Sequence, residues 1–224
     1  MLKLIKYPIL VLKDLILTLV IYLPGATGNR VRSLYYRQVL KSMGEGVVID
    51  TGVHISSPEL ISIGNNVHID KGCIIATGLS LPALKEPRAN SDFSFEQGEI
   101  VIGNDVHICQ GCILMGYGGI SLGDKFVMSA GSKVYSMTNV PCDRAEPHKV
   151  TSLMPYSQAI HLVGPVTTGP NVWLGLHCIV MPGVHIGENS FCASNSVVTS
   201  NLACNSHAAG QPAVMKKFRF SHGK

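Results

Sequence analysis

Aliphatic and small residues recur with a period of six along the second half of the chain, from Gly164 to Phe218. The first position of each block is mostly aliphatic, and the second is mostly small. The blocks open at Thr168, Leu174, Val180, Ile186, Cys192 and Val198. A period of six matches neither a helix, at about 3.6 residues, nor an ordinary strand, at about 2. It predicts a parallel β-helix, in which three blocks make one triangular coil and each opening residue points into the core.

The same register extends backwards through the chain. Earlier blocks open at Ile49, Ile55, Ile63, Ile69, Ile75, Ile102, Ile108, Leu114, Leu122, Met128 and Val134. The spacing breaks only after the third block of a coil, so every insertion is predicted to leave from one corner. The two large insertions cover residues 77–99 and 138–163. Stacked repeats commonly carry their insertions on the binding face, so we expect the functional side there.

The pattern divides the chain into three segments. An all-β solenoid is expected over residues 45–203, a helical segment over 1–44, and a C-terminal tail over 204–224. The first insertion is polar, and we expect it to form an arm that contacts a neighbouring subunit.

Two helices are predicted before the repeats. Residues 1–23 are rich in Leu and Ile, and their few charges fall on one narrow arc of a helical wheel. The longest uncharged run, Leu15 to Leu23, is too short to span a bilayer. Two alternatives stay open: the helix packs on the β-helix, or it lies in a membrane interface. A second helix is expected from about Asn29 to Met43.

Composition narrows the function classes. Hydrophobic residues make up 46% of the chain and charged residues 14%, so a large core is available. The net charge of +4 comes without a nucleic-acid-binding motif, so no nucleic-acid partner is expected. The seven cysteines are odd in number and scattered, which indicates reduced thiols and a cytoplasmic protein.

The register also predicts where most cysteines lie. Cys73, Cys112 and Cys178 share one position of the second block in their coils, with Ser132 and Ser196 at the same position. We therefore expect one inward column of small residues. Cys109 and Cys112 have the spacing of a redox pair, but they are expected on a strand and a corner rather than at a helix N-terminus.

Four histidines occur in a repeated V-H-I pattern: His54, His68, His107 and His185. Each precedes an opening residue, so each side chain is predicted to point outward. His68 and His107 should stack on successive coils, in a column continued by Val127, Trp173 and Phe191. A histidine pair can bind zinc, as in the hexapeptide carbonic anhydrases. No third histidine joins the column, and because zinc usually takes three protein ligands, no metal is expected.

The second insertion holds the densest set of acid–base groups near the insertion corner. These are Asn139, Asp143, Arg144, Glu146, His148, Tyr156 and His161. The alternative is a surface arm with solvated charges.

The last repeats and the residues after them resemble the hexapeptide-repeat acyltransferases, above all the maltose, galactoside and colanic-acid O-acetyltransferase branch. The matching motifs are Asn171-Val172-Trp173, Pro182-Gly183-Val184, Val198-Thr199 and Gly210-Gln211-Pro212-Ala213. The resemblance covers about residues 46–218. It implies a left-handed parallel β-helix, a homotrimer and acetyl-CoA as co-substrate, bound in a groove between subunits.

The resemblance also implies site residues. Leu176, Ser194 and Thr199 match positions that line the CoA groove, and Lys217 matches a cation near the donor phosphates. The family's catalytic histidine is replaced here by Asn139, whose amide is not basic.

A different base is therefore expected if the chain is catalytic. His161 is the first candidate and His148 the second, because both belong to the insertion that returns to the groove.

The sequence thus predicts an O-acetyltransferase that acts on a sugar or glycan hydroxyl in cell-surface polysaccharide or lipopolysaccharide biosynthesis. Such an enzyme is expected in the cytoplasm, with peripheral membrane contact through residues 1–41. Three alternatives are N-acetylation of an amino sugar or nucleotide sugar, a zinc protein similar to carbonic anhydrase, and a trimeric scaffold without activity.

Overall fold

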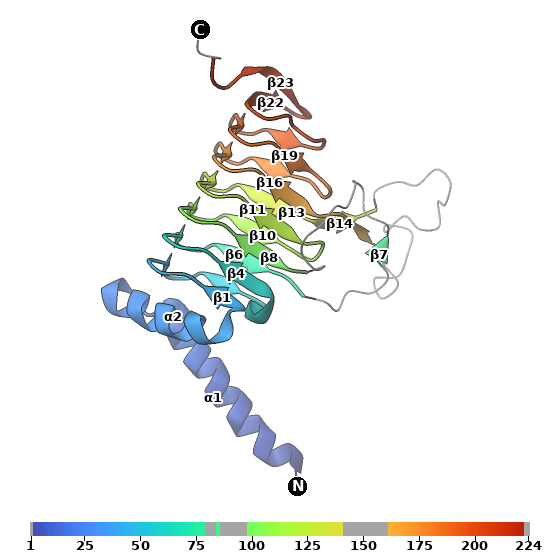
Figure 1. Cartoon of the computed structure of the whole chain (residues 1–224). Coiled ribbons are helices and arrows are strands. Elements are labelled where there is room, and N and C mark those ends of the chain that lie inside the picture. Colours follow the sequence, from blue (N-terminus) through green and yellow to red (C-terminus); the bar gives the residue numbers. More distant parts are fainter. Residues whose placement is uncertain (1, 79–83, 86–97, 141–160, 222–224) are drawn as a thin grey trace.

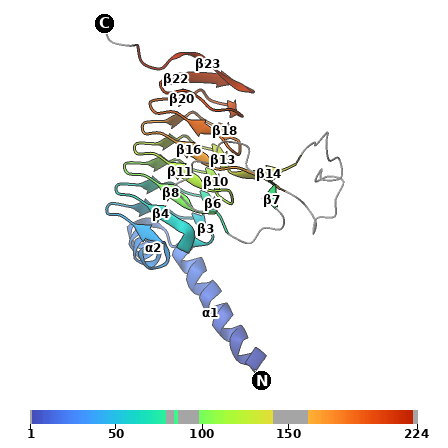
Figure 2. The same ribbon diagram turned by 45° about the vertical axis from the view of Figure 1, so that its right-hand side comes forward.

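A computed structural model describes residues 2–78, 84–85, 98–140 and 161–221 of the chain. Two helices, α1 (Leu2–Tyr22) and α2 (Gly25–Val39), precede a stack of short parallel strands. The stack rises from the helices toward the C-terminus, and α1 projects away from its base (Figures 1 and 2).

Three sheets form the walls of the stack, and the chain passes through them in the same order in every coil. Sheet A contains β1 (Ser42–Met43), β4 (Ile61–Ile63), β8 (Ile100–Ile102), β11 (Ile120–Leu122), β16 (Val166–Thr168) and β19 (His185–Ile186). Sheet B contains β2 (Val48–Ile49), β5 (His68–Ile69), β9 (His107–Ile108), β12 (Val127–Met128), β17 (Trp173–Leu174), β20 (Phe191–Cys192), β22 (Ser206–Gly210) and β23 (Ala213–Phe218). Sheet C contains β3 (His54–Ile55), β6 (Ile74–Ala76), β10 (Ile113–Met115), β13 (Lys133–Tyr135), β18 (Ile179–Val180) and β21 (Val197–Val198). This arrangement is a parallel β-helix, as the period of six predicts.

The predicted opening residues line the core. Nearly all are buried, and most have no exposed surface, as for Ile69, Ile108 and Leu174. Ile55, in the first coil, is half-buried. Stacked coils bury a continuous apolar column that no coil could bury alone, so the aliphatic opening position accounts for much of the stability of the stack.

The corner between sheets A and B is closed by residues with left-handed backbone. Asn66, Asp105 and Asn171 adopt φ of 55°, 56° and 56°. Asparagine and aspartate tolerate this region because their short polar side chains form local hydrogen bonds. Here the side chains also bond from coil to coil, as from Asn171 Nδ2 to Asn189 Oδ1 at 2.8 Å.

All insertions leave at the edge between sheets C and A, as predicted. The 3₁₀ helix η1 (Pro58–Leu60) follows β3, and the two large insertions follow β6 and β13. Each insertion ends where the chain enters the next strand of sheet A. The edge between C and A is therefore where the chain departs from the repeat.

The inward column of small residues is confirmed. Cys73, Cys112 and Cys178 are fully buried. Their thiols donate to the carbonyls of Cys109, Ser129 and Ala193, at 3.1, 3.2 and 3.0 Å. Ser132 and Ser196 are buried in the same column. These thiols act as small core groups, and burial raises the pKa of Cys178.

The helices are anchored to the first coil through Arg32 of α2. Its guanidinium is fully buried and donates to the carbonyls of Leu23 and Ile49, both at 2.7 Å. The bond to Leu23 satisfies a carbonyl at the end of α1, which a helix terminus leaves without a partner, and the bond to Ile49 reaches β2. The base of α1 is therefore fixed to the stack.

The observed helix bounds differ from those expected. The second helix begins at Gly25 and ends at Val39, rather than running from about Asn29 to Met43. Ser42–Met43 instead pairs with β4 as the first strand of sheet A. Within the described residues, no helix is long and apolar enough to cross a membrane.

The C-terminal segment, expected as a tail, adds strands to the stack. β22 pairs in parallel with β20, and β23 folds back antiparallel on β22. These strands extend sheet B beyond the last repeat, at the far end from α1 (Figure 1).

Candidate active site

A small fourth sheet forms where the two large insertions meet. Sheet D contains β14 (Met137–Asn139), β15 (His161–Val163) and β7 (Leu84–Lys85). β14 and β15 belong to the second insertion and pair antiparallel, and β7 of the first insertion pairs with β15. Sheet D stands off one side of the stack (Figures 1 and 2). The two insertions therefore support each other within one chain.

Asn139 and His161 lie directly opposite each other in this sheet. His161 Nδ1 is 3.1 Å from Asn139 Oδ1. Because an amide oxygen only accepts, the histidine Nδ1 carries the hydrogen in this bond. The neutral ring then has its lone pair on Nε2, ready to accept a proton. Asn139 is exposed and His161 is half-buried. Solvent and substrates can therefore reach the His161 side chain.

The base of sheet D is fixed by a buried serine. Ser136 Oγ donates to the carbonyl of Met115 at 2.8 Å and accepts from the Gly118 N–H at 2.9 Å. The Ser136 carbonyl accepts from the Gly164 N–H at 2.9 Å, which fixes the strand that returns. Both strands that carry Asn139 and His161 are therefore anchored at one point on the stack.

The residues expected to line the CoA groove occupy two edges of sheet C. Leu176 and Ser194 lie on successive coils between sheets B and C, where the Leu176 N–H donates to Ser194 Oγ at 3.2 Å. Thr199 directly follows β21, at the edge from which the insertions leave. All three are exposed.

Lys217 stands apart from this group. Lys217 lies in β23, opposite His207 in sheet B, and is exposed. His148 lies outside the described residues. The structure thus brings Asn139 to His161 and Leu176 to Ser194, while Lys217 lies on another wall.

Comparison with known proteins identifies the repeat. Residues 165–200 match the family model described as the hexapeptide repeat of succinyl-transferase. A segment covering 21% of the chain is 48% identical to the galactoside O-acetyltransferase of Escherichia coli K12, and it spans 24% of that protein. A structure of a variant of AntD, an N-acyltransferase from Bacillus cereus, in complex with dTDP and coenzyme A, is similar over 84% of this chain and 89% of AntD, with a TM-score of 0.65 and 26% identity.

In its repeat and its fold, the chain is similar to acetyltransferases and acyltransferases of the hexapeptide-repeat type. A Vibrio cholerae acetyltransferase of the same repeat, in complex with acetyl-CoA, shares the fold, with a TM-score of 0.55 and 15% identity over 85% of this chain and 77% of that one. The matched segment spans about a quarter of the galactoside enzyme.

In this hexapeptide-repeat protein, the C-x-x-C sequence does not offer a reactive thiolate. Cys112 is buried and donates to the Ser129 carbonyl. Burial and the nearby Asp70 carboxylate raise the pKa of Cys109. A nucleophilic cysteine needs a lowered pKa, so His161 is the better candidate for chemistry at the insertion edge.

Sequence reasoning did not find the supports of this site. Nothing in the first insertion signals that Leu84–Lys85 would pair with β15, because a two-residue strand has no detectable period. Ser136 and Gly118 were also not expected to matter. Gly118 could have been noticed in the sequence, because a glycine just before the start of a coil indicates that chain segments approach closely there.

Proposed function

We propose that this protein is a CoA-dependent acyltransferase that moves an acetyl group from acetyl-CoA to a sugar hydroxyl, with His161 as the general base. The observation that supports this most is the hydrogen bond between His161 Nδ1 and Asn139 Oδ1. It orients the imidazole and leaves Nε2 as the basic atom, at the insertion edge of a fold that acetyltransferases share.

The chemistry needs one proton acceptor and one acyl donor. His161 Nε2 takes the proton from the acceptor hydroxyl as its oxygen attacks the thioester carbonyl carbon. The tetrahedral intermediate then expels the CoA sulfur, which receives the proton from the imidazolium. Asn139 does not act as a base here; it stabilises the imidazole orientation from the opposite strand.

Acetyl-CoA is proposed to bind along the outside of the stack, with backbone groups at Leu176, Ser194 and Thr199 lining its path. Lys217 is proposed to attract the donor phosphates as a point charge. The resemblance that motivates this groove places it between two subunits of a left-handed β-helix, so we propose the same handedness and a homotrimer. His148 is kept as the second candidate for the base.

Two acceptors are supported by different observations. The galactoside O-acetyltransferase similarity favours a hydroxyl, but it covers only 21% of the chain. The similarity to AntD, an N-acyltransferase, extends over 84% of the chain and favours the amino group of a nucleotide sugar as the second candidate. Both acceptors lose a proton as they attack, so His161 has the same role in each case.

A cytoplasmic location at the membrane surface is proposed from the exposed apolar side chains of α1. Val11, Leu12, Leu15, Ile16 and Leu19 are all exposed there. Apolar surface of this kind suits a helix in the membrane interface. At that location the protein would lie close to precursors of cell-surface polysaccharides.

The test is turnover with acetyl-CoA and a panel of acceptors, read by the mass of the product. The panel contains galactosides and other neutral sugars on one side and dTDP-4-amino-4,6-dideoxyglucose on the other. His161→Ala should lower kcat by about 10²- to 10⁴-fold, the usual contribution of a general base. The control is His185→Ala, since His185 is another exposed histidine and its side chain hydrogen-bonds to Thr167 Oγ1, away from sheet D.

Three outcomes distinguish O-transfer, N-transfer and a scaffold without activity. Acetylated neutral sugar supports O-transfer, and acetylated amino sugar supports N-transfer. Binding of acetyl-CoA without turnover on any acceptor supports the scaffold alternative. A His161→Ala variant with the kcat of the unmodified protein rules out His161 as the base.

A further inference from the structure

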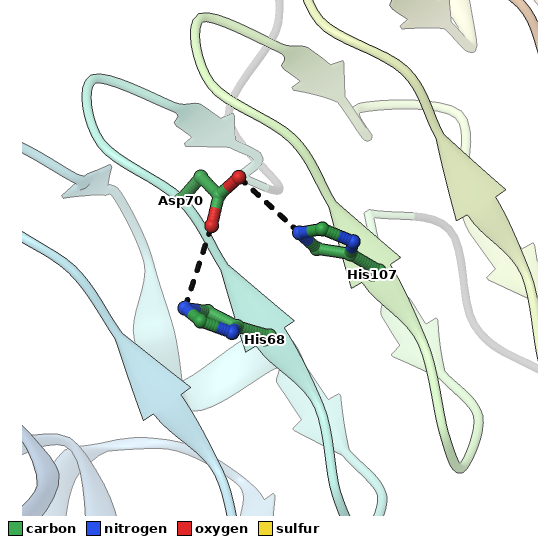
Figure 3. Close-up of side chains that lie close together, drawn as sticks. All are labelled: His68, Asp70 and His107. Atoms are coloured by element: carbon green, nitrogen blue, oxygen red, sulfur yellow. Dashed lines mark hydrogen bonds and ion pairs between the residues drawn. The ribbon is translucent and has the colours of Figure 1, made fainter.

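Two histidines and one aspartate converge on the outer face of sheet B. His68 in β5 and His107 in β9 are direct partners across the two parallel strands. Asp70 follows β5, and each of its two carboxylate oxygens points to one of the two imidazole rings (Figure 3). Asp70 Oδ1 is 3.4 Å from His68 Nε2, and Asp70 Oδ2 is 3.2 Å from His107 Nε2. One donor atom from each of the three residues lies within 4.8 Å of the others.

The backbone holds the two histidines firmly. Each histidine sits between two fully or almost fully buried residues, Val67 and Ile69 around His68, and Val106 and Ile108 around His107. Neighbouring strand residues point to opposite faces, so burial of these four fixes both imidazoles outward. Sites on strands in a packed wall are better fixed than sites on loops.

The spacing of the donor atoms suits a shared cation. Charge-assisted bonds between imidazolium and carboxylate are about 2.7–2.9 Å long. The His107 contact, at 3.2 Å, is a long hydrogen bond, and the His68 contact, at 3.4 Å, is longer still. Ligand atoms at about 2.0–2.1 Å from a tetrahedral zinc ion are separated by about 3.3 Å, which is close to both measured values.

We infer that His68, Asp70 and His107 form a binding site for a divalent transition metal, with zinc as the preferred ion. Imidazole nitrogen suits zinc, whereas magnesium and calcium prefer sites made of oxygen ligands. A carboxylate is a usual third ligand beside two histidines.

The fourth coordination position would face solvent. The side chains of His68 and His107 are 51% and 46% exposed, so water can complete the coordination. Cys109 Sγ lies 3.9 Å from His107 Nε2 and adds a soft donor next to the site. This site lies on a different wall of the stack from sheet D, and the proposed acyl transfer does not require it.

The expectation of no metal counted only histidines. Asp70 supplies the third donor, and its position was available from the sequence. In the strand pattern, residues two apart share a face, so Asp70 belongs beside His68.

The experiment measures zinc binding by the full-length, untagged chain after treatment with a chelator. Isothermal titration gives stoichiometry and affinity, and Co²⁺ is the spectroscopic probe, since a tetrahedral site gives strong visible absorption. We expect one equivalent of Zn²⁺ per chain. Asp70→Asn should weaken binding by at least about 100-fold, because even residues that only orient a ligand contribute 10- to 100-fold. His68→Ala and His107→Ala should do the same.

His185→Ala is the matched control. His185 occurs in the same V-H-I sequence and is exposed, but it lies in sheet A and contacts Thr167. This variant should bind zinc as the unmodified protein does. Zinc should also raise the unfolding temperature of the unmodified protein and of His185→Ala, but not of Asp70→Asn.

The inference is overturned if the unmodified protein binds zinc within about threefold of the Asp70→Asn affinity, or if His185→Ala loses binding as the site variants do. Retention of a folded state by Asp70→Asn is checked in the same thermal scans. Transferase turnover is measured separately, so failure of the metal site leaves the proposed function intact.

Discussion

Gly118→Ala should separate the catalytic geometry from the stability of the stack. Gly118 lies at the insertion edge, between β10 and β11, and its backbone is outside the left-handed region. A Cβ at this position would lie 2.3 Å from the Ser136 carbonyl oxygen and 2.7 Å from Val163 Cγ1. Alanine is therefore acceptable to the local backbone but collides with the base of both strands of sheet D.

The size of the effect follows from these contacts. Ordinary contacts begin at 3.4 Å, so the carbonyl must move by about 1 Å. The flanking strands carry Asn139 and His161, and a displacement of about 1 Å at a catalytic group costs on the order of 10²-fold in rate. Overpacking of this kind costs about 1–3 kcal/mol of folding free energy. We therefore expect kcat to fall by about 100-fold in a protein that still folds.

The assay pairs acetyl-CoA turnover with urea unfolding, and Gly111→Ala is the control. Gly111 adopts φ of +67°, but a Cβ there would meet nothing within 4 Å. This substitution should cost about 1–2 kcal/mol through backbone strain alone and leave kcat unchanged. The reasoning is refuted if Gly118→Ala keeps the kcat of the unmodified protein, or if Gly111→Ala lowers kcat to the same extent.

Two further predictions concern the imidazole support and the first helix. Asn139→Ala removes the hydrogen-bond acceptor for His161 Nδ1. Because a neutral hydrogen bond contributes about 0.5–1.5 kcal/mol, kcat should fall by about 2- to 13-fold, with an unchanged KM for acetyl-CoA. An unaltered kcat would contradict the role of Asn139 in orienting the imidazole. Leu19→Glu, on the exposed face of α1, should reduce cosedimentation with anionic phospholipid vesicles by at least about tenfold, since burying a leucine contributes about 1.5–3 kcal/mol. Leu34→Glu, on α2 and 66% exposed, is the matched control, and equal loss in both variants would argue against a membrane role for α1.

The repeat predicted most of the fold because its constraint is local. An opening residue every six positions determines which side chains enter the core, and this sufficed to align Cys73, Cys112 and Cys178 in one column. The single insertion edge followed from counting where the period breaks. No long-range pairing had to be guessed, since each coil stacks only on its neighbours.

The helix bounds and the site depended on contacts that no period encodes. α2 begins at Gly25, and Gly28 within it packs so closely against the end of α1 that a Cβ would lie 1.8 Å from the Leu23 carbonyl oxygen. His161 could be chosen as a candidate from its place in the insertion. Its pairing with Asn139 and Leu84 depends on strands that are far apart in sequence.

Confinement of the insertions to one edge makes the protein modular. The other two corners are tight turns with left-handed residues, stacked against the coils above and below, and added residues there would separate the coils. At the third corner, a loop can lengthen or be exchanged while the spacing of the stack stays the same. Relatives can thus diversify their insertions independently of the wall residues, and grafting the 77–99 and 138–163 segments between such chains is a route to changed acceptor preference.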